Sequence, residues 1–138
     1  MIRTVIDTNV FVAGLINDTG APAKIINYWE ERAFDLLISE SILTEYQNLL
    51  LNLNKVPTIK AREILQIIAQ LAIQIDIREN YSVCKDVSDN KFIDCAVNGE
   101  ADYLITKNLK HFPKDFRGVR VITVGDFLDV IEKYYFEV

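Results

Sequence analysis

Short runs rich in β-branched residues alternate with stretches of helical periodicity along the whole chain. The expected strands are residues 2–6, 34–38, 72–77, 103–106 and 120–123. The expected helices are residues 10–16, 22–32, 39–53, 58–71, 89–98 and 125–135. Because strands separated by helices are joined by right-handed crossovers, this order predicts an α/β fold with a central, mostly parallel five-stranded sheet and helices on both faces.

Two helices in the middle of the chain follow each other without a strand between them. Ser39 or Ser41 can cap the first one through its hydroxyl oxygen. Its apolar row is expected to be Ile42, Tyr46, Leu49 and Leu53. The second begins behind Pro57 and Thr58, so the two are expected to pack as an antiparallel pair.

The composition fits one ordinary domain. Half of the 138 residues are apolar, which is enough for a single hydrophobic core spanning residues 1–138. No run reaches the roughly 18 apolar residues of a membrane span, and the first strand meets Asp7 too soon for an export signal. We therefore expect a soluble, cytoplasmic protein in which Cys84 and Cys95 are free thiols.

The formal net charge of −5 is unfavourable for a nucleic-acid partner, because phosphate binding normally leaves a basic surface. A local exception lies between residues 107 and 120. The side chains there that could contact an RNA backbone are Lys107, Lys110, His111 and Lys114. A solvated surface loop explains the same residues equally well.

Asp7 directly follows the first expected strand. Ligands of parallel sheets gather beyond the carboxyl ends of the strands, and the apolar character of residues 2–6 favours a central position for this strand. Asp7 is therefore a candidate site residue. It has an alternative role, because an aspartate at this point can also cap the following helix.

Glu45 lies at the margin of the apolar stripe of its helix, near Ile42 and Leu49. A carboxylate at that margin either serves a site or extends to solvent, where it can pair with a basic neighbour.

Asp89 begins an expected helix and falls in line with its buried face, so it points toward the end of the sheet. Capping, shared with Ser88, is the competing role, and Asp86 can be a turn residue without chemistry. Asp94 is turned by about 140° from Asp89 around the helix, so the two carboxylates cannot easily bind the same ion.

Three carboxylates from distant segments suit a hard, oxygen-seeking cation such as Mg²⁺ or Mn²⁺, whereas zinc prefers His and Cys. Such an ion can activate a water and neutralise a scissile phosphate. His111 is the single histidine of the chain, and a phosphate contact or a surface position suits it better than the role of general base.

Four segments together resemble a PIN domain, the nuclease fold of toxin ribonucleases and RNA-processing enzymes. They are VIDTNVFV at 5–12, the stretch 39–50 around Glu45, DNKFI at 89–93 and ADYLITKN at 101–108. They span nearly the whole chain in the family's order, and the small size resembles the prokaryotic toxin branch. The resemblance implies a three-layer sandwich.

The resemblance also implies site residues. By position, the catalytic and metal-binding acids are Asp7, Glu45 and Asp89, with Asn9 and Thr106 helping to order the site. The implied activity is a Mg²⁺- or Mn²⁺-dependent endoribonuclease that cuts RNA. The implied partners are a small antitoxin protein and a second copy of the chain in a homodimer.

Asn108 departs from the family's pattern. Many relatives have a fourth aspartate there, whereas an asparagine offers an amide oxygen without a charge. A second metal ion is therefore expected to bind weakly, if it binds. Asp94 is the other acid that could compensate, although the helix geometry argues against it.

Two other functions remain open at this stage. A response-regulator receiver domain is also a small doubly wound fold, and Thr106-Lys107 fits it superficially. A receiver, however, needs an acidic pair beside the first strand, and Asp7 stands alone. The second alternative is a PIN-like protein that binds RNA or a partner without cutting.

Overall fold

The computed structural model describes residues 1–136, and within them the strands form one six-stranded sheet in the order β3-β2-β1-β4-β6-β5. The strands are β1 (Arg3–Ile6), β2 (Asp35–Ile38), β3 (Ile73–Gln74), β4 (Tyr103–Thr106), β5 (Asp115–Phe116) and β6 (Val119–Thr123). All neighbouring pairs are parallel except β5 and β6, which are antiparallel. Because β1 and β4 lie at the centre, the residues that follow them meet at one edge of the sheet.

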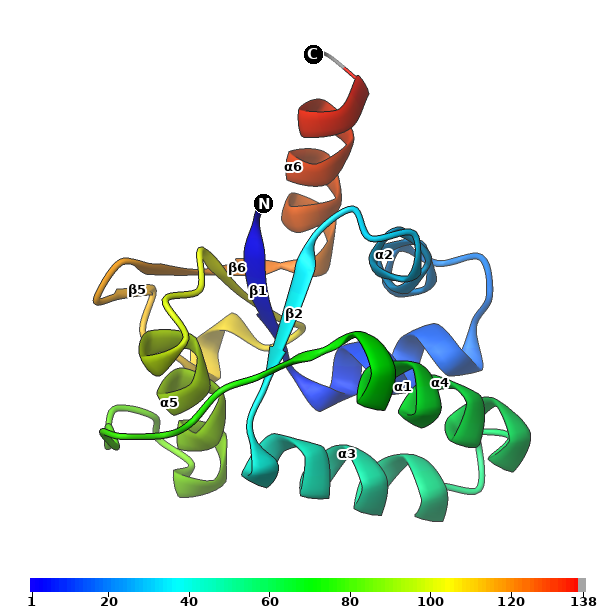
Figure 1. Ribbon diagram of the computed structural model, residues 1–138, viewed down its shortest axis with the longest axis horizontal. Coiled ribbons are helices and arrows are strands. Elements are labelled where there is room, and N and C mark those ends of the chain that lie inside the picture. The colour runs from blue at the N-terminus through cyan, green and yellow to red at the C-terminus, as the bar shows by residue number, and fades with distance from the viewer. Residues whose placement is uncertain (137–138) are drawn as a thin grey trace.

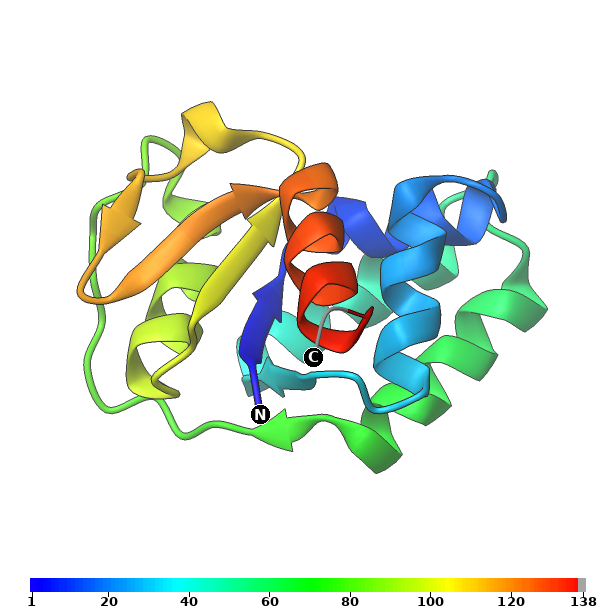
Figure 2. The ribbon, with the colours of Figure 1, turned by 90° about the horizontal axis from the view of Figure 1, so that it is seen from above.

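Helices cover both faces of this sheet (Figures 1 and 2). They are α1 (Thr8–Ile16), α2 (Ala21–Glu30), α3 (Glu40–Asn52), α4 (Thr58–Leu71), α5 (Asn90–Asn98) and α6 (Val124–Phe136), with short 3₁₀ turns η1 (Val87–Asp89) and η2 (Leu109–His111). The α5 helix packs on β1, β2 and β4, while α6 packs on β4 and β6 from the other side. The predicted α/β sandwich with a mostly parallel sheet is confirmed.

Phe11 of α1 lies at the centre of the helical half of the core. It is fully buried and makes edge-to-face contacts with Trp29 of α2 and Tyr46 of α3, at ring-centroid distances of 6.2 and 5.0 Å. Aromatic pairs at such distances add to the free energy of simple area burial. Phe11 therefore joins α1, α2 and α3.

The predicted helical hairpin is confirmed. Ser39 is the N-cap of α3, and its hydroxyl oxygen accepts a hydrogen bond from the backbone N–H of Ile42. Figure 1 shows α3 and α4 running antiparallel. The predicted apolar row was wrong in its second half, because the buried residues of α3 are Ile42, Tyr46 and Leu50. Leu53 ends the helix as its C-cap and is 40% exposed.

The strand count was also wrong, since the structure has six strands and not five. The additional strand, β5, is only two residues long and pairs with the edge of β6, so a sequence run could not reveal it. The third strand is much shorter than the predicted residues 72–77. Only Ile73 and Gln74 pair with β2, after which the chain leaves the sheet.

No helix in residues 1–136 combines the length and apolar character needed to cross a membrane. Cys84 and Cys95 are both free thiols, and burial raises the pKa of Cys95 to about 12. This agrees with the prediction for both cysteines.

Candidate active site

Asp7 follows β1 directly and is almost enclosed, with 7% of its surface exposed. Its backbone N–H donates to the carbonyl of Ile105 at 2.9 Å, so β1 is tied to β4 up to this residue. Asp7 occupies the N-cap position of α1, but its side chain makes no capping hydrogen bond. Burial raises the pKa of Asp7, and the backbone N–H of Asn9, in the first turn of α1, partly offsets this rise, so this carboxylate also interacts with the start of the helix.

Thr106, the last residue of β4, holds the carboxylate of Asp7. Its hydroxyl donates to Oδ2 of Asp7 at 2.8 Å and accepts from the backbone N–H of Asn108 at 3.0 Å. Thr106 is fully buried, so one hydroxyl connects Asp7 to the loop behind β4. Asn108 is exposed, and its side chain lines a shallow hollow together with Asn9 and Lys107.

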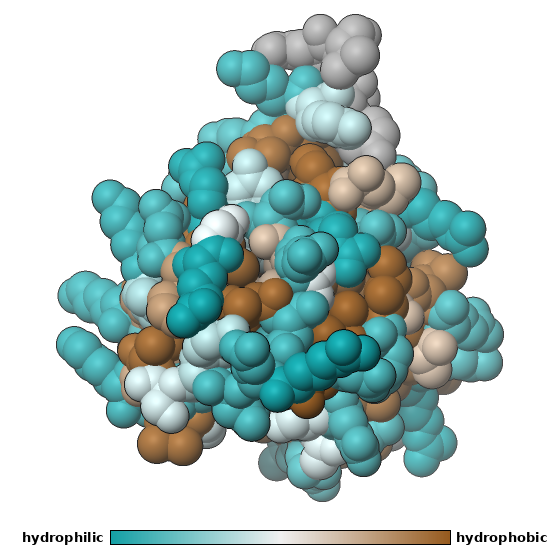
Figure 3. Space-filling model, turned by 60° about the vertical axis from the view of Figure 1, so that its left-hand side comes forward, coloured by the Kyte–Doolittle hydropathy of each residue, from teal (hydrophilic) through white to brown (hydrophobic). Residues whose placement is uncertain are grey.

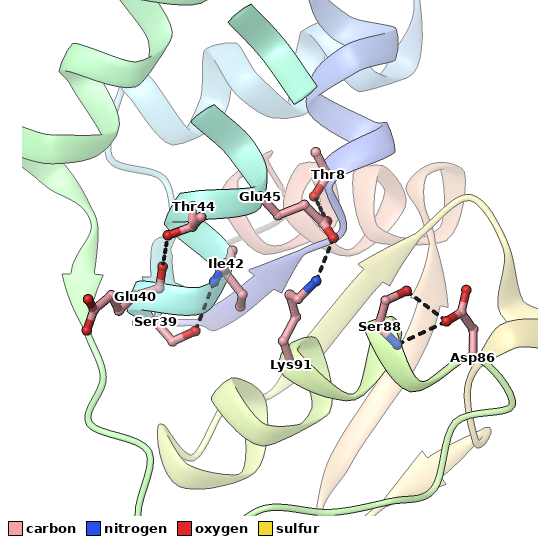
Figure 4. Close-up of polar contacts among 9 residues, drawn as sticks. All are labelled: Thr8, Ser39, Glu40, Ile42, Thr44, Glu45, Asp86, Ser88 and Lys91. Carbon is pink, nitrogen blue, oxygen red and sulfur yellow. Dashed lines mark hydrogen bonds and ion pairs between the residues drawn. The ribbon is translucent and has the colours of Figure 1, made fainter. Parts of the chain in front are cut away.

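Glu45 reaches the same region from α3. One of its oxygens accepts a hydrogen bond from the Thr8 hydroxyl, and its Oε1 lies 2.7 Å from Nζ of Lys91 (Figure 4). The next residue, Tyr46, donates its buried hydroxyl to the carbonyl of Ile6. Adjacent residues of α3 thus contact the two residues on either side of Asp7.

Asp89 lies in η1, at the N-cap position of α5, and makes no side-chain capping hydrogen bond either. Its Oδ2 atom is buried and has no hydrogen-bond partner within residues 1–136. The nearest cationic group is Nδ1 of His111, at 3.5 Å. A buried carboxylate oxygen without a partner is costly, so this atom is suited to a bound cation.

The pKa values of Asp7 and Asp89 are both raised, and neighbouring acids contribute to each rise. Burial raises the pKa of Asp7, the hydrogen bond from Thr106 partly offsets this, and the charges of Asp89 and Glu45 raise it further. Burial also raises the pKa of Asp89, and the charges of Asp86 and Glu45 add to that rise. Like charges raise a carboxyl pKa only over short distances, so this repulsion is consistent with acids that follow β1, lie on α3 and end η1 facing one region.

The chemistry of the donor set suits a hard divalent cation, because the candidate ligands are carboxylates and Oδ2 of Asp89 lacks a hydrogen-bond partner within residues 1–136. Among residues 1–136, no three Asp, Glu, His or Cys side chains lie close enough to hold a metal ion as they stand. The two oxygens of Glu45 are engaged by Thr8 and Lys91. A cation binding to Glu45 must therefore compete with both.

Asp94 and Asp86 have other partners. Asp94 is 8% exposed, and its Oδ1 accepts the backbone N–H of Tyr81 at 2.7 Å, which holds the segment before η1 against α5. Asp94 also lines the groove of about 900 Å³ next to Glu45 and Lys91. Asp86 caps η1 by accepting from the N–H and hydroxyl of Ser88 (Figure 4), so its predicted alternative as a turn residue is confirmed.

The candidate RNA contacts Lys107, Lys110, His111 and Lys114 are all exposed and follow β4. The side of the molecule with α5 and β5 presents mostly hydrophilic side chains, with smaller hydrophobic areas between them (Figure 3). Of these four candidates, His111 contacts the acids, through Asp89.

Two residues of the site were missed by sequence reasoning, namely Thr8 and Lys91. Thr8 follows Asp7, and its position in the sequence predicts only the start of a helix. Lys91 stands two residues after Asp89 in the DNKFI motif, and a lysine there has no periodic signal that distinguishes it from a surface residue. Two features could have indicated these residues. The carboxylate of Glu45 needs a basic or hydroxyl partner, and Lys91 stands in the same DNKFI motif as Asp89.

Asn108→Asp is expected to tighten Mn²⁺ binding by a few-fold, because it adds a carboxylate beside Thr106. Titration calorimetry on the metal-free protein measures the change, with Asn54→Asp, in the exposed turn between α3 and α4, as the matched control. If the Asn108 variant gains no affinity over that control, its side chain does not face the ion.

Known proteins resemble this chain in sequence and in fold. Residues 3–110 match the family model described as "PIN domain". The uncharacterized protein MJ1680 of Methanocaldococcus jannaschii is 32% identical over 145 aligned positions, which cover 96% of this chain and 94% of that protein.

Two solved structures have a similar fold at low sequence identity. One is VapBC2 from Rickettsia felis bound to a DNA fragment from its promoter, with a TM-score of 0.58, 16% identity, and coverage of 88% of this chain and 98% of that one. The other is DNA-bound VapBC from Salmonella typhimurium, with a TM-score of 0.61, 18% identity, and coverage of 90% and 99%.

Proposed function

This chain belongs to the PIN domain family, and on that premise we propose that it is an endoribonuclease that hydrolyses RNA phosphodiester bonds with Mg²⁺ or Mn²⁺. The observation that carries the proposal is a set of contacts around Asp7. Thr106 of β4 donates to its carboxylate, and Glu45 and Tyr46 of α3 contact the residues on either side of it. Asp7 directly follows the central strand β1, at the edge where a parallel sheet presents its ligand site.

The three acids are the residues that would hold the ion, and Thr106 orients Asp7 for this purpose. When bound, a divalent ion supplies a water of lowered pKa and neutralises charge on the scissile phosphate. The low exposure of Asp7 limits competing water around its carboxylate. The exposed Lys107, Lys110 and Lys114 can attract the RNA backbone toward this edge.

We further propose that the protein is the toxin of a toxin/antitoxin pair, with a small antitoxin as its partner and a homodimer as its assembly. The fold similarity to two VapBC structures supports this. The net charge of −5 suits a basic antitoxin segment. Such a ribonuclease would act on cellular RNA in the cytoplasm.

The test is cleavage of an end-labelled single-stranded RNA by the purified full chain. We expect endonucleolytic products with Mn²⁺ or Mg²⁺, none with excess chelator, and recovery when the metal is restored. A DNA oligonucleotide of the same sequence is the control for substrate class. Cleavage that persists in chelator, or no cleavage with any divalent metal, would contradict the proposal.

RNA binding without cleavage would instead favour a PIN-domain protein that binds without cutting. Asn108 is the specific observation in favour of that alternative, because it contributes no charge at the fourth position.

A further inference from the structure

Lys91 brings a positive charge into the candidate metal site. Its Nζ lies 2.7 Å from Oε1 of Glu45, and the two side chains are only 20% and 23% exposed. Lys91 also stands in the first turn of α5, two residues after Asp89. Burial raises the pKa of Asp89 and the charge of Lys91 partly offsets this rise, so the ammonium acts on Asp89 as well as on Glu45.

The stability of α5 does not explain this position. A cation in the first turn of a helix interacts unfavourably with the helix dipole. A partly buried ion pair also contributes little net free energy to folding, because the loss of hydration offsets the attraction between the charges. We therefore attribute the position of Lys91 to its effect on the charge of the candidate site.

When Lys91 is counted, the net charge of the site's side chains is equal and opposite to that of one divalent ion. Asp7, Glu45 and Asp89 contribute three negative charges and Lys91 one positive charge, which leaves −2. Asn108 adds none, and His111 counts only when it is protonated. One Mg²⁺ or Mn²⁺ would neutralise the site, whereas a second ion would leave an excess of two positive charges.

We propose that the Lys91 ammonium takes the place of a second metal ion, so that the site holds a single divalent cation beside a fixed positive charge. The proposal rests on the metal site of the proposed function. Lys91 lines the groove beside Glu45, so its Nζ is also accessible to a phosphate oxygen of a bound RNA.

Binding of Mn²⁺ to the full chain without RNA tests this, measured by titration calorimetry and by the electron paramagnetic resonance of free Mn²⁺. We expect one ion per chain in the unmodified protein. Lys91→Met should bind Mn²⁺ about tenfold more tightly, because it removes a like charge from the site. Lys91→Arg should behave as the unmodified protein.

Lys60→Met is the matched control, since Lys60 also pairs with a carboxylate, Asp18, at 2.9 Å but far from the site. The inference is overturned if Lys91→Met binds no more tightly than Lys60→Met, or if the unmodified protein binds two ions. If the unmodified protein binds no Mn²⁺, the proposed function fails together with the inference. One bound ion with unaltered affinity in Lys91→Met removes only the inference.

Discussion

Asp7→Asn is expected to lower kcat/KM for metal-dependent RNA cleavage by at least about a thousandfold, because a metal ion supplies several kcal/mol of transition-state stabilisation. The substitution removes a metal-binding charge and almost no volume. The amide oxygen can still accept the hydrogen bond from Thr106. Cleavage of labelled RNA at saturating Mn²⁺ measures the loss.

The same substitution is expected to raise the thermal stability of the metal-free protein by a few degrees at pH 7, on the order of 1 kcal/mol. Burial raises the pKa of Asp7, and the charges of Asp89 and Glu45 add to the rise, so the ionised carboxylate destabilises the native state above that pKa. This destabilisation is lost as the pH falls through the raised value toward that of an unfolded aspartate. The advantage of the variant should shrink over the same range.

Asp129→Asn is the control, because Asp129 is exposed on α6, away from the site. Calorimetric unfolding of both variants from pH 4 to pH 8 follows the effect. Full cleavage by Asp7→Asn would contradict the assignment of Asp7 as a metal ligand. A lower stability than that of Asp129→Asn at pH 7 would contradict the view that the ionised Asp7 carboxylate destabilises the metal-free protein.

Phe11→Ala is expected to lower the free energy of unfolding by about 3–5 kcal/mol, because it leaves a cavity where the ring now packs. Phe11 is fully buried between Trp29 and Tyr46, so the loss affects three helices. Urea denaturation followed by circular dichroism measures the change, with Phe116→Ala, in a partly buried position at the edge strand, as the comparison. A loss below about 1 kcal/mol would show that Phe11 is not central to the packing.

The core and the order of helices and strands could be predicted from the sequence, because burial of one face spaces the apolar residues periodically along each element. Residues 103–106 form a strand with the predicted bounds, and the antiparallel pair α3 and α4 was evident from its two capping regions. The short strand β5 did not follow, because two residues carry no period and pair only through the edge of β6. Leu53 was predicted in the apolar row of α3 but is its C-cap. The periodic pattern does not mark where a helix ends, because local backbone geometry sets that position.

The candidate site was predictable as a set of acids and not as a set of contacts. Asp7, Glu45 and Asp89 could be predicted together only from the ordered PIN-like segments, because each of them alone also fits an ordinary structural role as a helix cap or a surface residue. Their partners could not, because the Lys91–Glu45 pair joins residues 46 positions apart, and such a pairing exists only in the folded chain. Helix geometry predicted that Asp94 and Asp89 do not share an ion, but the bond of Asp94 to the Tyr81 N–H could not be foreseen.

The most direct test of the site is a crystal structure of the full chain soaked in Mn²⁺, with the anomalous signal of manganese used to place the ion. We expect one manganese peak per chain, with oxygen ligands from Asp7, Glu45 and Asp89 and with the Lys91 ammonium displaced from Oε1 of Glu45. A manganese ion bound away from these three carboxylates, or none while Glu45 remains paired with Lys91, would contradict this expectation.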